Sequence, residues 1–201
     1  LSYVSLDPLA EEFEARKQFD DRGLASAAVW HPRGDYLFVA MRGSRAVERI
    51  DAFTGAQSGS LLDAGFAPQG LAISPDGTRL YVDAYASREL VIYDLTAIAS
   101  SPFPVARVPL VDEEPLPPDE ARGLVLFNDA FDLRLGRDSY VACAHCHLDG
   151  ESDRLTWDFT DRGEGIRNTI SLIGRAATAH GPIHWSGNFD EAQDFEHDLR
   201  G

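Results

Sequence analysis

Lysine is nearly absent from this chain, and cysteine, methionine and long apolar runs are also scarce or missing. The 18 basic residues include a single lysine, Lys17, and are outnumbered by 33 acidic residues, which gives a formal net charge of −15. Such a surface repels nucleic acid and anionic membranes, so both are excluded as main partners. No apolar run is long enough to span a bilayer. This charge would favour a basic partner protein or metal cations. Equally, the acidic surface could serve only to keep the protein soluble.

The remaining composition is that of a folded globular protein, with 44% apolar and 25% charged residues. A length of 201 residues allows one large domain or two small ones. The chain begins at Leu1 without an initiator methionine or an export-signal pattern. Together with the incomplete repeat described next, this favours a piece of a longer protein.

An internal repeat occupies the first half of the sequence. Residues 27–51 align with residues 70–94 without a gap at an offset of 43 residues. Each copy shows period-two alternation, a Pro-x-Gly turn and a closing aspartate, which predicts several short strands per copy. A repeat of this length with several strands is typical of a β-propeller blade. The matched turn and strand-end positions are Pro32 with Pro75, Gly34 with Gly77, and Asp51 with Asp94.

The second copy, "SPDGTRLYVDAYASRELVIYDL", resembles the YVTN-type propeller repeat, with Tyr81-Val82-Asp83-Ala84 at its signature position. The resemblance covers residues 20 to about 100. It implies about two incomplete all-β blades over residues 1–99. Six prolines then crowd residues 100–118, where they disfavour helix and central strand, so this stretch is predicted to be an extended linker.

Residues 119–201 are predicted to form a small all-α, cytochrome c-like domain, so the whole chain is of a mixed multidomain class. A helix is expected to start at Pro118, where Asp119 and Glu120 favour the helix dipole. Apolar residues follow at helical spacing up to Phe131. The segment is short for a self-sufficient core, and a bound cofactor would supply the missing interior.

The only two cysteines lie three apart and are followed by a histidine: Cys143, Cys146 and His147. In c-type haem attachment the two thiols bind the vinyl groups and the histidine binds iron. A redox dithiol, a structural zinc site and a small disulfide are the alternatives. Zinc lacks further regularly spaced ligands, and so short a disulfide loop cross-links little chain. The motif therefore predicts covalent haem c.

The order "GLVLFNDAF…CAHCHLDGESD…GIRNTISLIGR…HGPIHWSGNFDEAQDF" resembles the first haem domain of bacterial di-haem cytochrome c peroxidases and their relatives. The resemblance covers residues 119–201. It implies His147 as the proximal iron ligand, Trp185 as an electron relay between two haems, and Asn168 near a calcium site. It also implies a second haem domain, in cis or in trans, without which peroxidase activity is not expected.

The second axial ligand departs from the family pattern, since no histidine follows the motif at the expected distance. His184 and His180 are the candidates, with His197 a weaker one. A buried packing role is slightly favoured for His184. Arg167 is a candidate for a haem propionate contact, with a surface salt bridge as an equal alternative.

A cluster of three acidic residues follows the haem motif: Asp149, Glu151 and Asp153. It hints at calcium but lacks a complete calcium loop, so a solvated turn is preferred.

Two functions follow from these features. The first is a haem redox protein of the peroxidase type, which exchanges electrons with a donor or acceptor protein. The alternative is a non-catalytic, propeller-based binding or surface protein with an ancillary haem or dithiol domain. Haem attachment of this type implies a periplasmic or extracellular bacterial protein.

Overall fold

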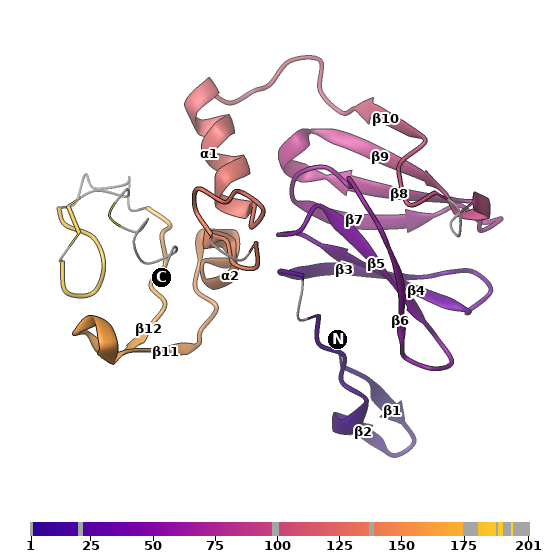
Figure 1. Ribbon diagram of the computed structural model, residues 1–201, viewed down its shortest axis with the longest axis horizontal. Coiled ribbons are helices and arrows are strands. Elements are labelled where there is room, and N and C mark those ends of the chain that lie inside the picture. Colours follow the sequence, from indigo (N-terminus) through magenta and orange to yellow (C-terminus); the bar gives the residue numbers. More distant parts are fainter. Residues whose placement is uncertain are drawn as a thin grey trace.

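The structure is a computed structural model that describes residues 2–19, 22–97, 101–136, 139–174, 181–187, 189–190 and 194. Two four-stranded sheets lie side by side, and the helices α1 (Pro118–Asn128) and α2 (Cys143–Cys146) separate them from a small two-stranded sheet (Figure 1). Within the described part of the chain, no helix is long and apolar enough to cross a membrane.

The two four-stranded sheets are antiparallel meanders, each with its strands in sequence order. The first three strands of the second sheet begin and end 43 residues after those of the first, so the predicted repeat is confirmed. The N-terminal half therefore consists of two β-propeller-type blades. Blade 1 contains β3 (Ala25–Trp30), β4 (Tyr36–Met41), β5 (Ala46–Asp51) and β6 (Gln57–Leu61), and blade 2 contains β7 (Pro68–Ile73), β8 (Arg79–Ala84), β9 (Glu89–Asp94) and β10 (Ala106–Pro109).

The strand β10 lies inside the segment that the prolines predict to be a linker. It pairs with β9 as the outer strand of blade 2, and Pro109 lies opposite Glu89. An edge strand tolerates proline because one of its sides needs no hydrogen-bond donors. The proline-rich linker therefore also supplies the last strand of the blade.

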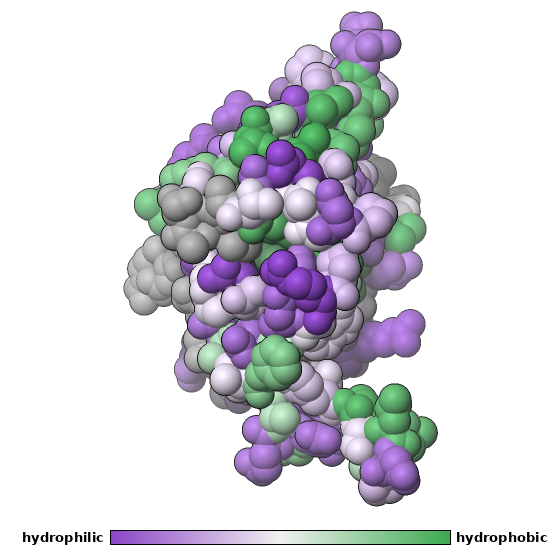
Figure 2. Space-filling view, turned by 90° about the vertical axis from the view of Figure 1, so that its right-hand side faces the viewer, coloured by the Kyte–Doolittle hydropathy of each residue, from purple (hydrophilic) through white to green (hydrophobic). Residues whose placement is uncertain are grey.

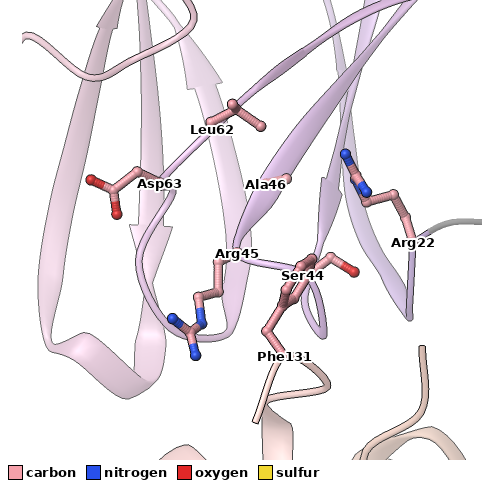
Figure 3. Close-up of a pocket in the computed structure, with 7 residues that line it drawn as sticks. All are labelled: Arg22, Ser44, Arg45, Ala46, Leu62, Asp63 and Phe131. Atoms are coloured by element: carbon pink, nitrogen blue, oxygen red, sulfur yellow. The ribbon is translucent and has the colours of Figure 1, made fainter. Parts of the chain in front are cut away.

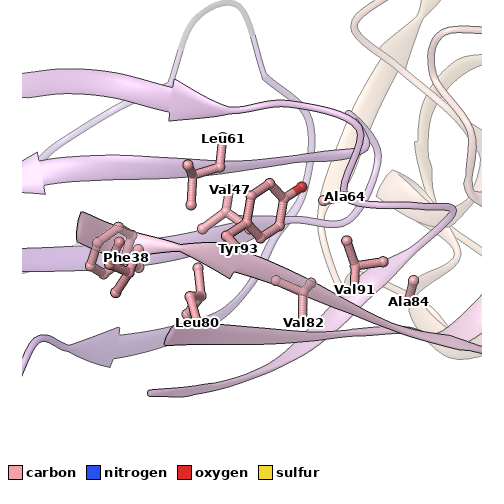
Figure 4. Close-up of a cluster of buried hydrophobic side chains, with 10 residues drawn as sticks. Phe38, Val47, Leu61, Ala64, Leu80, Val82, Ala84, Val91 and Tyr93 are labelled. Atoms are coloured by element: carbon pink, nitrogen blue, oxygen red, sulfur yellow. The ribbon is translucent and has the colours of Figure 1, made fainter. Parts of the chain in front are cut away.

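Alternation along the strands of blade 2 places one of the two core clusters between the blades. In β8, the side chains of Leu80, Val82 and Ala84 are buried, and the residues between them are partly exposed. These side chains pack against Phe38 and Val47 of blade 1 (Figure 4). Because successive strand residues face opposite sides of a sheet, one period-two pattern from each blade suffices to build this core.

A tyrosine closes the same core at one end. Tyr93 is 1% exposed, and its hydroxyl donates a hydrogen bond to the Leu62 carbonyl at 2.7 Å. Burial raises the pKa of the phenol well above its usual range. The side chain therefore acts as a neutral donor that ties β9 of blade 2 to the end of blade 1.

The Pro-x-Gly turns of the two blades allow a matched test of packing. Gly34 and Gly77 both have φ of 73°, yet a methyl group at Gly34 would meet no atom within 4 Å, whereas at Gly77 it would lie 2.7 Å from Nε2 of His31. We expect Gly34→Ala to lower the free energy of unfolding by about 1–2 kcal/mol, the penalty of left-handed backbone. Gly77→Ala should cost about 1–3 kcal/mol more, because buried His31 must move. Chemical denaturation of both variants measures the difference, and equal losses would contradict the prediction.

The chain before the blades forms a hairpin of its own, from β1 (Val4–Leu6) and β2 (Leu9–Glu11). Apolar side chains on this hairpin are exposed, among them Leu6 at 86% and Leu9 at 78%. Figure 2 shows apolar surface at the lower end of the molecule, where Figure 1 places this hairpin.

The prediction of an all-α domain over residues 119–201 is wrong. The expected helix does begin at Pro118, as α1 (Pro118–Asn128), but α2 (Cys143–Cys146) is a single turn and β11 (Thr156–Phe159) pairs with β12 (Gly165–Asn168). Glycines with positive φ, such as Gly150 and Gly163, interrupt any helix here. Short 3₁₀ turns complete the chain: η1 (Phe13–Ala15), η2 (Tyr85–Ser87), η3 (Leu95–Ala97), η4 (Leu148–Gly150) and η5 (Thr160–Arg162).

Candidate functional site

The two cysteines and the histidine of the motif occupy one helical turn and its end. Cys143 begins α2, Cys146 ends it, and the His147 amide donates to the Cys143 carbonyl at 2.9 Å. Both cysteines are partly buried and are not joined by a disulfide. One turn of helix therefore carries both thiols, with the imidazole at its end, which is the residue order that c-type haem attachment requires.

His147 is oriented by a backbone carbonyl. Its Nδ1 lies 3.0 Å from the carbonyl oxygen of Ile170, which can only accept, so the proton lies on Nδ1. In the neutral ring the lone pair then lies on Nε2, the usual arrangement of a metal-binding histidine with a carbonyl behind it. Burial lowers the pKa of His147 and outweighs the Ile170 carbonyl, which raises it. The residues present therefore fit a haem with His147 as its proximal ligand.

Exposed apolar side chains surround the motif. Leu148, Leu155 and Trp157 are 40–55% exposed, and Ile173 is 60% exposed. Two hydrogen bonds place their segments beside the motif: the Leu172 amide donates to the Gly150 carbonyl at 2.7 Å, and the Asp153 amide to the Cys146 carbonyl at 2.9 Å. A porphyrin needs apolar walls of this kind, so this surface also fits the group.

The thiols are not tuned for redox exchange. Burial raises the pKa of Cys143, and burial together with the negative charge of Asp153 raises the pKa of Cys146 to about 11. Reactive cysteines of a redox dithiol have lowered pKa values instead. The electrostatics therefore disfavour the dithiol alternative.

This difference gives a direct prediction for the haem-free chain. Because thiolate is the attacking species, folded Cys146 should react with iodoacetamide at pH 8 about one to two orders of magnitude more slowly than in the urea-denatured chain. Timed alkylation read by mass spectrometry measures both rates. Equal or faster reaction in the folded chain would restore the redox dithiol interpretation.

Two arginines of blade 1 hold the haem-motif segment. They lie in the docking turn, residues 42–45 between β4 and β5. Arg42 donates to the Asn128 side-chain oxygen at 2.9 Å and to Asp149 at 2.7 Å. Arg45 forms a two-pronged ion pair with Asp129. The end of α1 and the turn after the haem motif are thereby fixed to the blade.

His145, between the two cysteines, packs into a slot in the same blade. A methyl group at Gly23 would lie 2.2 Å from its Nε2, and one at Gly43 would lie 2.8 Å from its Cε1. The imidazole accepts a hydrogen bond from the Ala142 amide at 2.9 Å, and burial lowers its pKa. Sequence reasoning does not single out this residue, because no local pattern links it to glycines more than 100 residues earlier.

A pocket of about 320 Å³ lies beside the docking turn (Figure 3). Both arginines of its lining form ion pairs with acids: Arg22 with Glu48 at 2.8 Å, and Arg45 with Asp129. The pocket therefore offers no unmatched positive charge for an anion. Its lining residues are Arg22, Ser44, Arg45, Ala46, Leu62, Asp63 and Phe131.

His184, one candidate for the second axial ligand, interacts electrostatically with His147 of the motif. The Trp185 indole donates to the Asn168 carbonyl, and His147 is anchored on the Ile170 carbonyl, two residues further along. Because two residues span at most about 7 Å, the carbonyls that hold Trp185 and His147 lie on the same short stretch of chain. His180 and His197, the other candidates, lie outside the described residues.

The remaining predicted site residues are less closely connected. Arg167 is partly exposed and donates to the Ile166 carbonyl at 2.9 Å, so its propionate contact stays a prediction. Trp185 is 53% exposed, and its role as a relay is likewise untested. For calcium, Asp149 is paired with Arg42, and Asp153 accepts from the Trp157 indole at 3.0 Å. Among the residues described, no three His, Cys, Asp or Glu side chains form a metal site.

No protein-family model and no curated protein matches the chain. Solved structures with partial similarity include Kuenenia stuttgartiensis hydrazine synthase, at 23% identity and a TM-score of 0.41 over 48% of this chain and 26% of that one. Dihydro-haem d1 dehydrogenase NirN matches at 26% identity with a TM-score of 0.38, over 45% of this chain and 18% of that one. The RRP9 WD40 repeats match at 17% identity with a TM-score of 0.38, over 47% of this chain and 28% of that one. The chain therefore spans less than a third of each, and the blade assignment depends on its own strand order.

Proposed function

We propose that this chain is a propeller-based binding protein that carries an ancillary, covalently attached haem c. The observation that carries the proposal is the turn at Cys143 and Cys146, followed by His147 with its Nδ1 held on the Ile170 carbonyl. When bound, haem supplies one-electron exchange. The protein's own part is to hold the thiols on one turn, orient the imidazole and attach the segment to blade 1 through Arg42 and Arg45.

The proposal extends to location and partners. Haem attachment of this type takes place beyond the cytoplasmic membrane, so we place the protein in the periplasm or outside the cell. The net charge of −15 favours a partner with a basic surface, including an electron-donor or acceptor protein. Peroxidase activity is not part of this proposal, because the described part of residues 119–201 lacks the all-α fold that the resemblance to the peroxidases implied.

The test is expression in a host that performs cytochrome c maturation, followed by a reduced-minus-oxidised spectrum and haem staining after denaturation. The wild-type chain should keep its colour through denaturation, and the double variant Cys143→Ala/Cys146→Ala should lose it. Glu151→Gln is the matched control, because this exposed carboxylate near the motif should not affect attachment. A colourless wild-type protein from the competent host would refute the haem proposal.

The ancillary position of the haem has its own measurable consequence. The double cysteine variant should keep the far-UV circular dichroism of the two blades, because neither of their core clusters includes a residue after Leu95. Loss of the β-sheet signal together with the haem would show that the haem is integral to the fold, which would contradict this part of the proposal.

A further inference from the structure

Glu164 is a buried carboxylate with one specific neighbour. Its side chain is 5% exposed, and its Oε2 lies 2.9 Å from Nδ1 of His184. Neither carboxylate oxygen accepts a well-formed hydrogen bond in the part of the chain that the structure describes. A buried carboxylate is costly unless it is paired, so its position beside the imidazole calls for an explanation.

The ring of His184 is fixed on several sides. It stacks on Phe189 at 5.1 Å between ring centres and meets the edge of Phe159 at 5.9 Å. Its backbone has φ of 73°, a left-handed conformation that costs a non-glycine residue about 1–3 kcal/mol and that is concentrated at ligand sites. The next residue, Trp185, is tied to the Asn168 carbonyl. Packing of this kind holds an imidazole in one orientation.

His184 resembles His147 in having an oxygen atom beside its Nδ1. There a backbone carbonyl engages Nδ1, and here a buried carboxylate lies against Nδ1. In both rings the nitrogen that can bind a metal is then Nε2, and the group behind Nδ1 sets the orientation and basicity of the ligand. The carbonyls that anchor His147 and Trp185 are two residues apart, and His147 interacts electrostatically with His184, the residue before Trp185.

We propose that His184 is the second axial ligand of the haem bound by His147, and that Glu164 is its positioning residue. This inference rests on the proposed haem attachment. It implies a six-coordinate, low-spin iron built for electron transfer, with no open site for a small ligand.

The experiment uses the full chain, matured with haem, and reads coordination rather than activity. The wild-type protein should give a low-spin ferric spectrum and should bind carbon monoxide slowly or not at all after reduction. His184→Ala should keep its covalent haem on a stained denaturing gel, become high-spin and bind carbon monoxide rapidly. Added imidazole should restore the low-spin spectrum. His184→Met should stay six-coordinate with a raised reduction potential, because methionine–histidine ligation raises it.

Glu164→Gln tests the positioning role separately. The amide carries no charge to increase the basicity of the imidazole, so the iron should stay low-spin while its reduction potential rises. Glu14→Gln, the same change at an exposed residue before the blades, should leave the potential unchanged.

The outcomes separate this inference from the haem proposal. A wild-type protein with covalent haem that is already high-spin, or a His184→Ala spectrum identical to the wild type, would overturn His184 as a ligand and leave the attachment site intact. Absence of covalent haem in the wild type would overturn both.

Discussion

Replacing Glu48 by alanine should lower the free energy of unfolding by about 3–5 kcal/mol, the cost of breaking a buried ion pair from one side. Glu48 is fully buried in β5, and its carboxylate accepts from Arg22 at 2.8 Å, Gln57 at 2.6 Å and Ser60 at 2.7 Å. Without it, the Arg22 guanidinium loses this buried partner, and two polar groups of β6 lose their acceptor.

Urea denaturation followed by circular dichroism measures this loss. Glu11→Ala is the matched control, since Glu11 pairs with Arg16 at 2.6 Å on the exposed N-terminal hairpin, where solvent screens the interaction. The control should leave the urea midpoint almost unchanged. Similar midpoints for the two variants would show that the Glu48 network does not stabilise blade 1.

Replacing Arg42 by alanine should release the haem-motif segment from the blades. The side chain is 10% exposed and serves Asn128 and Asp149 together. Its loss leaves the buried Asn128 oxygen without its donor, which should lower the free energy of unfolding by about 1–3 kcal/mol. The released segment should be cut by protease after residue 110, and the blades should survive as a stable fragment.

Limited proteolysis with mass mapping compares this variant with Arg134→Ala. Arg134 is exposed and forms an ion pair with Asp132 inside a single loop, so its removal should leave the contacts of Arg42 with Asn128 and Asp149 in place. Only Arg42→Ala should accelerate cleavage. Equal cleavage in the wild type and Arg42→Ala would mean that the docking turn does not hold the segment.

The blades could be predicted from the sequence because their signals are local. Period-two alternation such as Leu80 and Val82, a repeated Pro-x-Gly turn and a constant offset each depend on residues close in the chain. The start of α1 is local in the same way, since Pro118 and two acids mark it. The spacing of the two cysteines is local as well, because residues three apart lie on the same face of one helical turn.

The rest depends on contacts between distant residues. The strands β11 and β12 are four residues each, too short for a clear pattern, and they form because they pair with each other. Nothing local to His145 indicates that it fits between Gly23 and Gly43. The pairing of His184 with Glu164 joins two loops that no sequence pattern connects. The all-α expectation is wrong because the order of motifs along a chain does not determine its secondary structure.

The two blades have nearly the same corner, and only one of them can receive the haem-motif segment. In both corners a serine hydroxyl accepts a backbone amide, and an arginine adopts a left-handed backbone. The corners differ at three positions that contact the docked segment, where Gly23, Arg42 and Gly43 of blade 1 are replaced by Phe66, Tyr85 and Ala86 of blade 2. Tyrosine cannot provide the guanidinium, and the alanine methyl would close the imidazole slot. A three-residue divergence between the two repeated units thus leaves this pseudo-symmetric scaffold with one docking position for the segment that carries Cys143, Cys146 and His147.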